Sequence, residues 1–206
     1  MKVKGKKMKQ EILDRIKELG GNIDDVKGDS LLEDFQSITF NTVLYLKPES
    51  TPWESDIVIG LDELINENIS LFNIDSESFY NKVIDHYYRV TDEPLGQVFF
   101  KNTLFTPFKE GTEDFEEWDG EWEEEGFKEV IKGEEMDLMN IGYSYGYPDH
   151  YFICLSDPNL ENPTVYGTDH ETYFSEITIE GSLEEYFNSF ISRDELIEMI
   201  KAKLEN

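Results

Sequence analysis

The amino-acid sequence predicts an α+β fold, in which a mostly antiparallel sheet is flanked by helices. Helix-spaced apolar residues lie toward both ends of the chain. Short segments rich in β-branched and aromatic residues, separated by turn residues, fill much of the second half. The chain of 206 residues, 38% hydrophobic and 14% aromatic, has room for one domain, residues 1–206, with a sizeable core.

The first half of the chain is predicted to alternate between helical and strand-like segments. In the first helix, Met8, Ile12 and Ile16 recur at helical spacing, and Gly20 follows as a stop signal. Residues 38–46, ITFNTVLYL, have the composition of a strand. The predicted elements are a helix at 6–19, strands at 38–46 and 56–60, helices at 61–68 and 72–90, and a strand at 97–105.

The second half is predicted to complete the sheet and to end in two helices. Two capping-box pairs, Ser182 with Glu185 and Ser192 with Glu195, mark the starts of these helices. The predicted elements are strands at 139–145, 150–156, 164–168 and 173–179, followed by helices near 183–191 and 193–204.

The charge of the chain is strongly negative and unevenly distributed. There are 46 Asp and Glu residues against 18 Lys and Arg, which gives a formal net charge of −28. A field of this sign disfavours nucleic-acid backbones and anionic membranes as partners, and it favours a cationic partner. Residues 1–9, with five lysines and no acid, are either a flexible, disordered basic arm or, as we prefer, a solvated first helical turn.

The sequence predicts a cytoplasmic protein that needs no cofactor or metal. The single cysteine cannot form an internal disulfide, no run of about 18 apolar residues is present, and the basic start lacks the apolar stretch of a secretory signal. The glycine-rich phosphate loops, the GxSxG nucleophile turn and the HExxH zinc motif are absent. We therefore expect no catalytic residues.

Histidine and cysteine residues offer weaker alternatives. The pairs Asp149-His150 and Asp169-His170 could bind a metal in principle, but neighbouring residues of a strand point to opposite faces, so neither pair converges locally. Cys154 with one of these histidines could form a thiol nucleophile and its base. Because Cys154 lies in the apolar run YFICL, it is interpreted as a core residue instead.

The sharpest feature is the acid-rich segment, residues 110–135. It holds 13 acidic residues and two lysines, with four aromatic residues between them. It is predicted to be an insertion or a long exposed hairpin, with FKEVI, residues 127–131, as the returning strand. Aromatic residues among carboxylates suit the capture of a basic protein, since aromatic anchors and complementary charge promote association. The alternative is that these aromatic residues fold back onto the core.

A group of tyrosines is the second candidate surface. Tyr143, Tyr145 and Tyr147 share one face in an extended chain. That face is either a binding platform or, as we prefer, the inner face of the sheet under the terminal helices. The predicted partner-binding residues are Trp118, Asp119, Glu121, Trp122, Glu123, Glu124, Glu125 and Phe127, with Tyr143, Tyr145 and Tyr147 as neighbours.

The last third of the chain resembles the Smi1/Knr4 (SUKH) superfamily. The matching features are Ile141-Gly142 at a strand entry, the strand 151–155, Val165-Tyr166 at a strand end, the polar turn Asp169-His170-Glu171 and the helix 183–191. Residues 56–65, DIVIGLDELI, fit the strand-then-helix step that precedes the sheet in this family. The leucine-proline helix entry and the Asn-Gly usual near the family's N-terminus are not found, and the acid-rich segment is peculiar to this chain.

This resemblance implies an α+β fold without catalytic residues. For bacterial members it implies an immunity protein that binds and neutralises a cognate toxin, often a nuclease. We therefore expect a protein partner, a basic toxin whose active site is covered, and neither nucleic acid nor membrane. One alternative is a regulatory or scaffold protein like the fungal members. Another is a hydrolase that uses Glu121 and Glu123 in an aromatic, acidic cleft.

Overall fold

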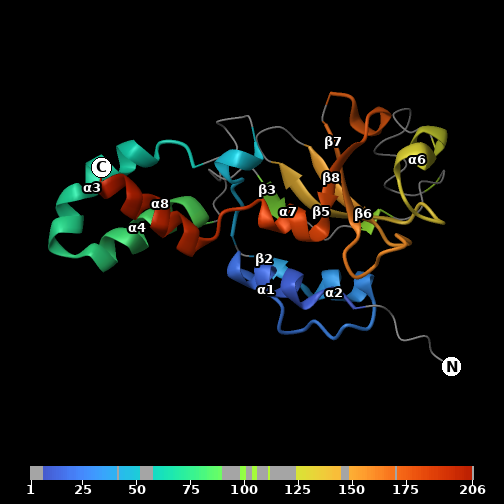
Figure 1. The fold of residues 1–206 in the computed structure, drawn as a ribbon, viewed down its shortest axis with the longest axis horizontal. Helices are drawn as coiled ribbons and strands as arrows, with labels where there is room; N and C mark the ends of the chain where they lie inside the picture. Colours follow the sequence, from blue (N-terminus) through green and yellow to red (C-terminus); the bar gives the residue numbers. More distant parts are fainter. Residues whose placement is uncertain are drawn as a thin grey trace.

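The computed structural model has the α+β fold that the sequence predicts (Figure 1). It describes residues 7–40, 42–51, 58–89, 98–100, 104–105, 111, 124–144, 149–169 and 171–205. The helices are α1 (Gln10–Glu18), α2 (Leu31–Ser37), α3 (Leu61–Ile74), α4 (Ser76–Tyr88), α6 (Glu124–Val130), α7 (Leu183–Asn188) and α8 (Arg193–Leu204), with 3-10 turns η1 (Pro48–Ser50) and η3 (Tyr173–Ser175). The strands are β1 (Gly21–Asn22), β2 (Thr39–Phe40), β3 (Val98–Phe100), β4 (Leu104–Phe105), β5 (Leu138–Ser144), β6 (His150–Cys154), β7 (Thr164–Thr168) and β8 (Thr178–Ser182).

An antiparallel sheet of six described strands forms the centre of the molecule. Strands β3, β5, β6, β7 and β8 lie side by side in that order, and β4 pairs with the other end of β5. The register places Gly142 of β5 opposite Tyr151 of β6, and Tyr151 opposite Gly167 of β7. Strands β1 and β2 form a separate two-stranded sheet beside α1.

The alternation of side chains along the strands gives the central sheet two apolar faces. The α7 face contributes Met139, Ile153 and Val165 to a core that includes side chains of α1, α2 and α7. The α6 face contributes Phe152 and Tyr166 to a second core beneath α6. Figure 1 shows α7 lying across the sheet, α1 and α2 beneath it, and α6 at the opposite end from α3 and α4.

Helices α3, α4 and α8 form a separate layer at one end of the elongated molecule (Figure 1). The rings of Tyr87 and Tyr88, at the end of α4, make edge-on contacts with Tyr45 from the chain before η1. The Tyr45 hydroxyl donates to the carbonyl of Tyr87 at 2.7 Å, and the Tyr88 hydroxyl donates to the carbonyl of Ile191 at 2.9 Å. These hydrogen bonds from buried hydroxyl groups join the end of α4 to the chain before η1 and to the chain between α7 and α8.

An ion-pair network joins this helical layer to the rest of the molecule. Arg15 of α1 contacts one carboxylate oxygen of Glu195 in α8 at 2.8 Å, and Lys47 contacts the other at 2.8 Å. Arg15 also donates to the carbonyl of Phe190, after α7, at 2.6 Å. Although burial opposes the shift, hydrogen bonds from Lys47 and Arg15 lower the pKa of Glu195 to about 2.

Several elements differ from the sequence prediction. Residues 38–46 are not a continuous strand, because β2 has two residues and the described residues 42–46 belong to no strand. Helix α2 was not predicted, and it begins after Ser30, whose hydroxyl accepts a hydrogen bond from the backbone N–H of Glu33 at 3.1 Å. Residues 173–179 begin with the 3-10 turn η3 before β8 starts.

Other predicted elements are close to those observed. The strand at 97–105 corresponds to β3 and β4, and the helix at 61–68 continues to residue 74 as α3. The predicted strand at 56–60 is not found in its described part, since residues 58–60 belong to no strand and form a turn at 59–60 before α3, and residues 56–57 lie outside the described residues, as does the basic arm up to residue 6. Within the described part of the chain, no helix is long and apolar enough to cross a membrane.

Candidate binding surfaces

Most of the predicted partner-binding residues lie outside the described part of the chain. These are Trp118, Asp119, Glu121, Trp122, Glu123, Tyr145 and Tyr147. Glu124 and Glu125 lie in the first turn of α6. Tyr143 pairs with His150 on the α6 face, where their ring centroids are 5.5 Å apart. The preferred interpretation, which placed Tyr143 under the terminal helices, is therefore wrong, since α7 covers the opposite face.

The end of the acid-rich segment is a helix, which corrects the predicted returning strand. Phe127 and Ile131 are four residues apart and project to the same side, as helical geometry dictates. Phe127 is completely buried, and its ring centroid is 5.4 Å from that of Phe174. The prediction that Phe127 contacts a partner is therefore wrong, because this ring belongs to the core of the domain.

The described elements on either side of residues 106–123, β4 and α6, both involve Leu138 at the start of β5. Before it, β4 pairs Phe105 with Leu138 at the start of β5. After it, Phe127 packs in the same buried cluster as Leu138. The backbone N–H of Lys132 then donates to the hydroxyl of Tyr166 at 2.8 Å. The acid-rich segment is thus attached to the sheet on both sides of its most acidic part.

The two groups considered for chemistry, His150 and Cys154, lie in the core. The Nδ1 atom of His150 is 2.7 Å from the side-chain amide nitrogen of Asn140, and the thiol of Cys154 donates to the carbonyl of Glu135 at 3.2 Å. His150 and Cys154 are four positions apart along β6, a separation of about 13 Å, so their imidazole and thiol groups cannot form a catalytic pair. His170 lies outside the described residues, and among those described no three His, Cys, Asp or Glu side chains gather to hold a metal.

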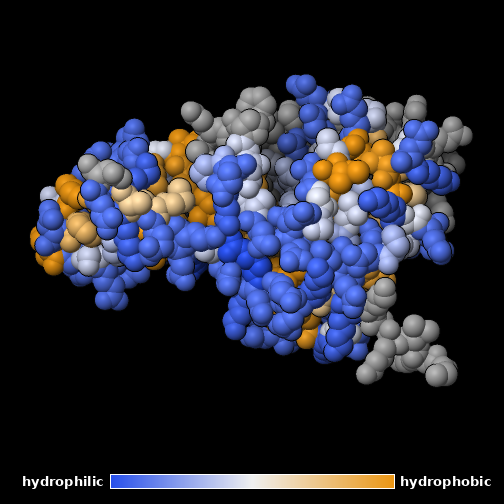
Figure 2. All heavy atoms as spheres, in the orientation of Figure 1, coloured by the Kyte–Doolittle hydropathy of each residue, from blue (hydrophilic) through white to orange (hydrophobic). Residues whose placement is uncertain are grey.

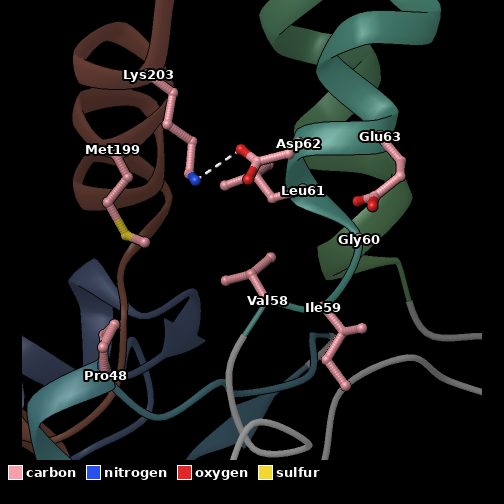
Figure 3. A pocket seen from close by; sticks show the side chains of 9 residues that line it. All are labelled: Pro48, Val58, Ile59, Gly60, Leu61, Asp62, Glu63, Met199 and Lys203. Atoms are coloured by element: carbon pink, nitrogen blue, oxygen red, sulfur yellow. Dashed lines mark ion pairs between the residues drawn. The ribbon is translucent and has the colours of Figure 1, made fainter. Parts of the chain in front are cut away.

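An open pocket lies between the start of α3 and the end of α8 (Figure 3). Its volume is about 340 Å³, and Val58, Leu61 and Met199 form an apolar lining. Figure 3 shows Lys203 and Asp62 reaching toward each other across it, with 2.6 Å between their charged atoms. This pocket could accept an apolar side chain, but an exposed ion pair of this kind supplies neither a nucleophile nor much stability.

A smaller pocket of about 110 Å³, here called the Tyr186 pocket, lies on the α7 face and is lined by Tyr151, Glu180 and Tyr186. Tyr151 has a glycine on each side in the sheet, Gly142 and Gly167. The hydroxyl of Tyr186 lies over Gly142, where a Cβ atom would overlap it. The carboxylate of Glu180 lies over Gly167, 2.8 Å from the position of a Cβ. Because Gly142 and Gly167 have no side chains, the hydroxyl of Tyr186 and the carboxylate of Glu180 can both approach the sheet.

The hydroxyl of Tyr186 is the unusual atom of this pocket. Tyr186 is only 6% exposed, and its hydroxyl is buried without a hydrogen-bond partner. Burial, with the nearby Tyr151 and Glu180, raises the pKa of Tyr186 well above its usual value. The hydroxyl of Thr178 donates to the carboxylate of Glu180 at 2.5 Å. The other described lining residues, which carry no charge, are Leu46, Ser50, Ser189 and Phe190.

Figure 2 shows hydrophilic side chains over most of one face of the molecule, with apolar atoms gathered in a few places. One such place is the far left, where α3 passes into α4 and Ile74 is 86% exposed. Another lies between β8 and α6. Ile179 of β8 is also exposed, at 56%. Scattered apolar residues are normal on a protein surface, so neither place defines a binding site by itself.

Comparisons with known proteins place the chain in no family. No family model matches it, and no curated protein or solved structure matches it either. The resemblance to the Smi1/Knr4 superfamily therefore remains a prediction.

The Tyr186 pocket was missed at the sequence level. Tyr186 falls inside a predicted helix and Glu180 just beyond a predicted strand, so nothing local connects them. The available signal was the presence of Gly142 and Gly167 within strand-like segments, because glycine in a strand often marks a close approach of another group.

Proposed function

We propose that this chain is a non-catalytic binding protein of the immunity type, which neutralises a basic toxin domain by covering its active site. The observation that carries the proposal is the attachment of the acid-rich segment to the sheet: β4, before the segment, pairs with Leu138, and Phe127, within it, packs in the same buried cluster as Leu138. Fixed ends reduce the conformational entropy that a segment loses when it binds. A carboxylate-rich segment that is held by packed elements before and within it therefore suits the recognition of a basic protein.

The charge of the chain supports the same class of partner. A net charge of −28 attracts a cationic protein over long distances and raises the rate of association. A toxin that cleaves nucleic acid has a basic surface, because that surface must bind phosphates. The carboxylates of the acid-rich segment would occupy that surface in place of the phosphates.

The first test is affinity capture of the tagged chain from the lysate of its own organism, with elution in a salt gradient and identification by mass spectrometry. We expect a basic toxin domain that elutes at high salt and is inhibited by stoichiometric amounts of the purified chain. Capture of a housekeeping complex would instead support the regulatory or scaffold alternative. Undiminished toxin activity in the complex would contradict the proposal.

The aromatic part of the surface is tested by Trp122→Ala, measured against the captured partner. Loss of a central aromatic anchor is expected to weaken binding by roughly 30-fold, with an unchanged circular dichroism spectrum. The control is Ile74→Ala, which removes an exposed apolar side chain at the far end of the helical layer. Equal affinities for the two variants would exclude the acid-rich segment as the contact.

The acidic part is tested by the double variant Glu121→Gln/Glu123→Gln, with Glu67→Gln/Glu205→Gln as a matched change of charge elsewhere. The first variant is expected to associate more slowly and to show a weaker dependence of the association rate on salt. A hydrolase that used these carboxylates would instead lose turnover completely, which distinguishes that alternative.

A further inference from the structure

The Tyr186 pocket has the features of a binding site that is separate from the acid-rich segment. Within the described part of the chain, the buried side-chain atoms without a hydrogen-bond partner belong to Asp34, Thr168 and Tyr186. Of these residues, Tyr186 also lines a pocket of about 110 Å³. A buried hydroxyl without a partner is costly, and a ligand that donates a hydrogen bond to it would remove that cost.

The electrostatic character of the pocket selects the sign of its ligand. Among the described residues that line it, Glu180 is the one that carries a charge, and none of them is a lysine or arginine. The hydroxyl of Thr178 supports one oxygen of the Glu180 carboxylate. The aromatic ring of Tyr151 packs against Tyr186 with 5.5 Å between centroids, and it also lines the pocket. A carboxylate, a hydroxyl and an aromatic ring together favour a cation.

We propose that the Tyr186 pocket binds the guanidinium group of an arginine side chain contributed by a protein partner. The acceptors lie over Gly142 and Gly167, on opposite sides of Tyr151, so the ligand needs donors that point in different directions. A guanidinium group carries five N–H donors in a fixed plane and stacks on aromatic rings, whereas an ammonium group is a compact point charge. The pocket volume of about 110 Å³ suits one such group with part of its aliphatic stem.

This inference rests on the proposed function only for the source of the arginine, since the binding of a free guanidinium can be measured alone. The probe is ethylguanidinium, titrated into the full-length chain at constant ionic strength and followed by amide chemical shifts. We expect saturable shifts at Tyr151, Gly167 and Glu180. We also expect n-propylammonium to bind several-fold more weakly and n-propanol to cause no saturable shift.

Two variants identify the groups that hold the probe. Glu180→Gln is expected to weaken binding at least tenfold, because it removes the charge-assisted hydrogen bond. Tyr186→Phe keeps the ring and is expected to weaken binding roughly threefold through loss of a neutral acceptor. The control is Glu176→Gln, which removes the same charge just after η3 and is expected to bind normally.

Each contrary result overturns the proposal. These results are no saturable shift in the native chain, equal affinity for n-propylammonium, or unchanged affinity in Glu180→Gln or Tyr186→Phe. Urea unfolding of each variant shows whether it is folded. Failure here, with partner binding still sensitive to Trp122→Ala, would leave the role of the acid-rich segment intact and remove only the arginine pocket.

Discussion

At the scale of single residues, two glycines decide the shape of the α7 face. Gly142 and Gly167 flank Tyr151 in the register of the sheet. Neither is among the glycines with positive φ, so the requirement at these positions is for space and not for an unusual backbone conformation. Because no Cβ is present, the side chains of Tyr186 and Glu180 rest directly on the backbone of the strands.

We expect Gly142→Ala to lower the free energy of unfolding by about 1–3 kcal/mol, because the new methyl group would overlap the hydroxyl of Tyr186. Adding Tyr186→Phe removes that hydroxyl and is expected to recover part of the loss. Urea unfolding of the two single variants and the double variant gives the coupling energy.

The matched control is Gly126→Ala in α6. A Cβ at this position meets no atom within 4 Å, and alanine favours a helix over glycine. We therefore expect unchanged or slightly increased stability. Equal losses for Gly126→Ala and Gly142→Ala would contradict a specific close approach at Gly142.

At the scale of elements, the helices and strands that are marked by local sequence patterns could be predicted from the sequence. Both predicted capping boxes are present, at Ser182 with Glu185 and at Ser192 with Glu195. Strand β7 and helix α8 also have the predicted bounds or nearly so. A hydroxyl that caps a helix and an alternation of apolar residues act over a few residues, so the sequence alone reveals them.

Elements decided by tertiary contacts were not predictable in the same way. The segment 38–46 has a strand-like composition. Its residue Tyr45 nevertheless packs among the apolar side chains of the helical layer, because the chain passes into that layer. Phe127 of α6 and Ile131 just after it fit a helical face as well as a short strand, and packing of Phe127 against Phe174 accompanies the helix.

The candidate surfaces were predictable in kind but not in geometry. Composition located the acid-rich segment, whereas only the structure shows that β4 before it pairs with Leu138 and that Phe127 within it packs in the same cluster as Leu138. The Tyr186 pocket unites Tyr151 of β6, Glu180 of β8 and Tyr186 of α7, and their meeting depends on strand order and register. Neither property is encoded in a local pattern.

The capping box of α8 provides a prediction at this scale. The hydroxyl of Ser192 accepts a hydrogen bond from the backbone N–H of Glu195 at 3.2 Å, so Ser192→Ala is expected to cost about 1 kcal/mol of unfolding free energy. Ser192→Thr keeps the cap and should be milder. Ser70→Ala, at an exposed position within α3, is the control and should be neutral or slightly stabilising. Equal stability of the alanine and threonine variants at position 192 would contradict this role.

The attachment of α6 provides a second prediction. Phe127→Ala removes a completely buried ring and is expected to cost about 3–5 kcal/mol, measured by urea unfolding. Hydrogen exchange should also become faster at the amide of Lys132, which donates to Tyr166. Glu129→Ala changes an exposed residue of the same helix and should have little effect. A similar effect of both substitutions would show that α6 is not held by Phe127.

At the scale of the whole molecule, the sheet and the helical layer depend on one another through Glu195. This carboxylate receives Arg15 from α1 and Lys47 from the chain before η1. Arg15 in turn donates to the carbonyl of Phe190 between α7 and α8. A single acidic group therefore contributes to the attachment of segments that are far apart in the sequence.

We expect Glu195→Gln to lower the free energy of unfolding by about 1–2 kcal/mol at neutral pH. The shift from 4.5 to about 2 in the pKa of Glu195 corresponds to about 3 kcal/mol, and exposure of 39% of its side chain reduces this through solvent screening. Because the folded pKa is the lower one, the contribution is present above pH 4.5 and is lost as the pH falls toward 2. Glutamine preserves the capping box, so the variant isolates the charge.

The measurement is urea unfolding of the native chain and the variant from neutral pH down to pH 2. The two proteins should differ most at neutral pH and converge in acid. Glu198→Gln is the control, because Glu198 is 71% exposed and pairs with Lys201 on the same helix. A difference between Glu195→Gln and the native chain that does not depend on pH would contradict the network.

Because Cys154 is buried, the rate at which a thiol reagent modifies it can measure the opening of the structure around α6. A Cβ at Gly133 would come within 2.5 Å of its sulfur, so the backbone just after α6 covers the thiol. A thiol reagent therefore reaches Cys154 only when this cover opens, and the sequence contains no other cysteine to react. The rate of modification therefore measures how often the backbone next to α6 opens. A partner that binds the acid-rich segment should reduce this rate.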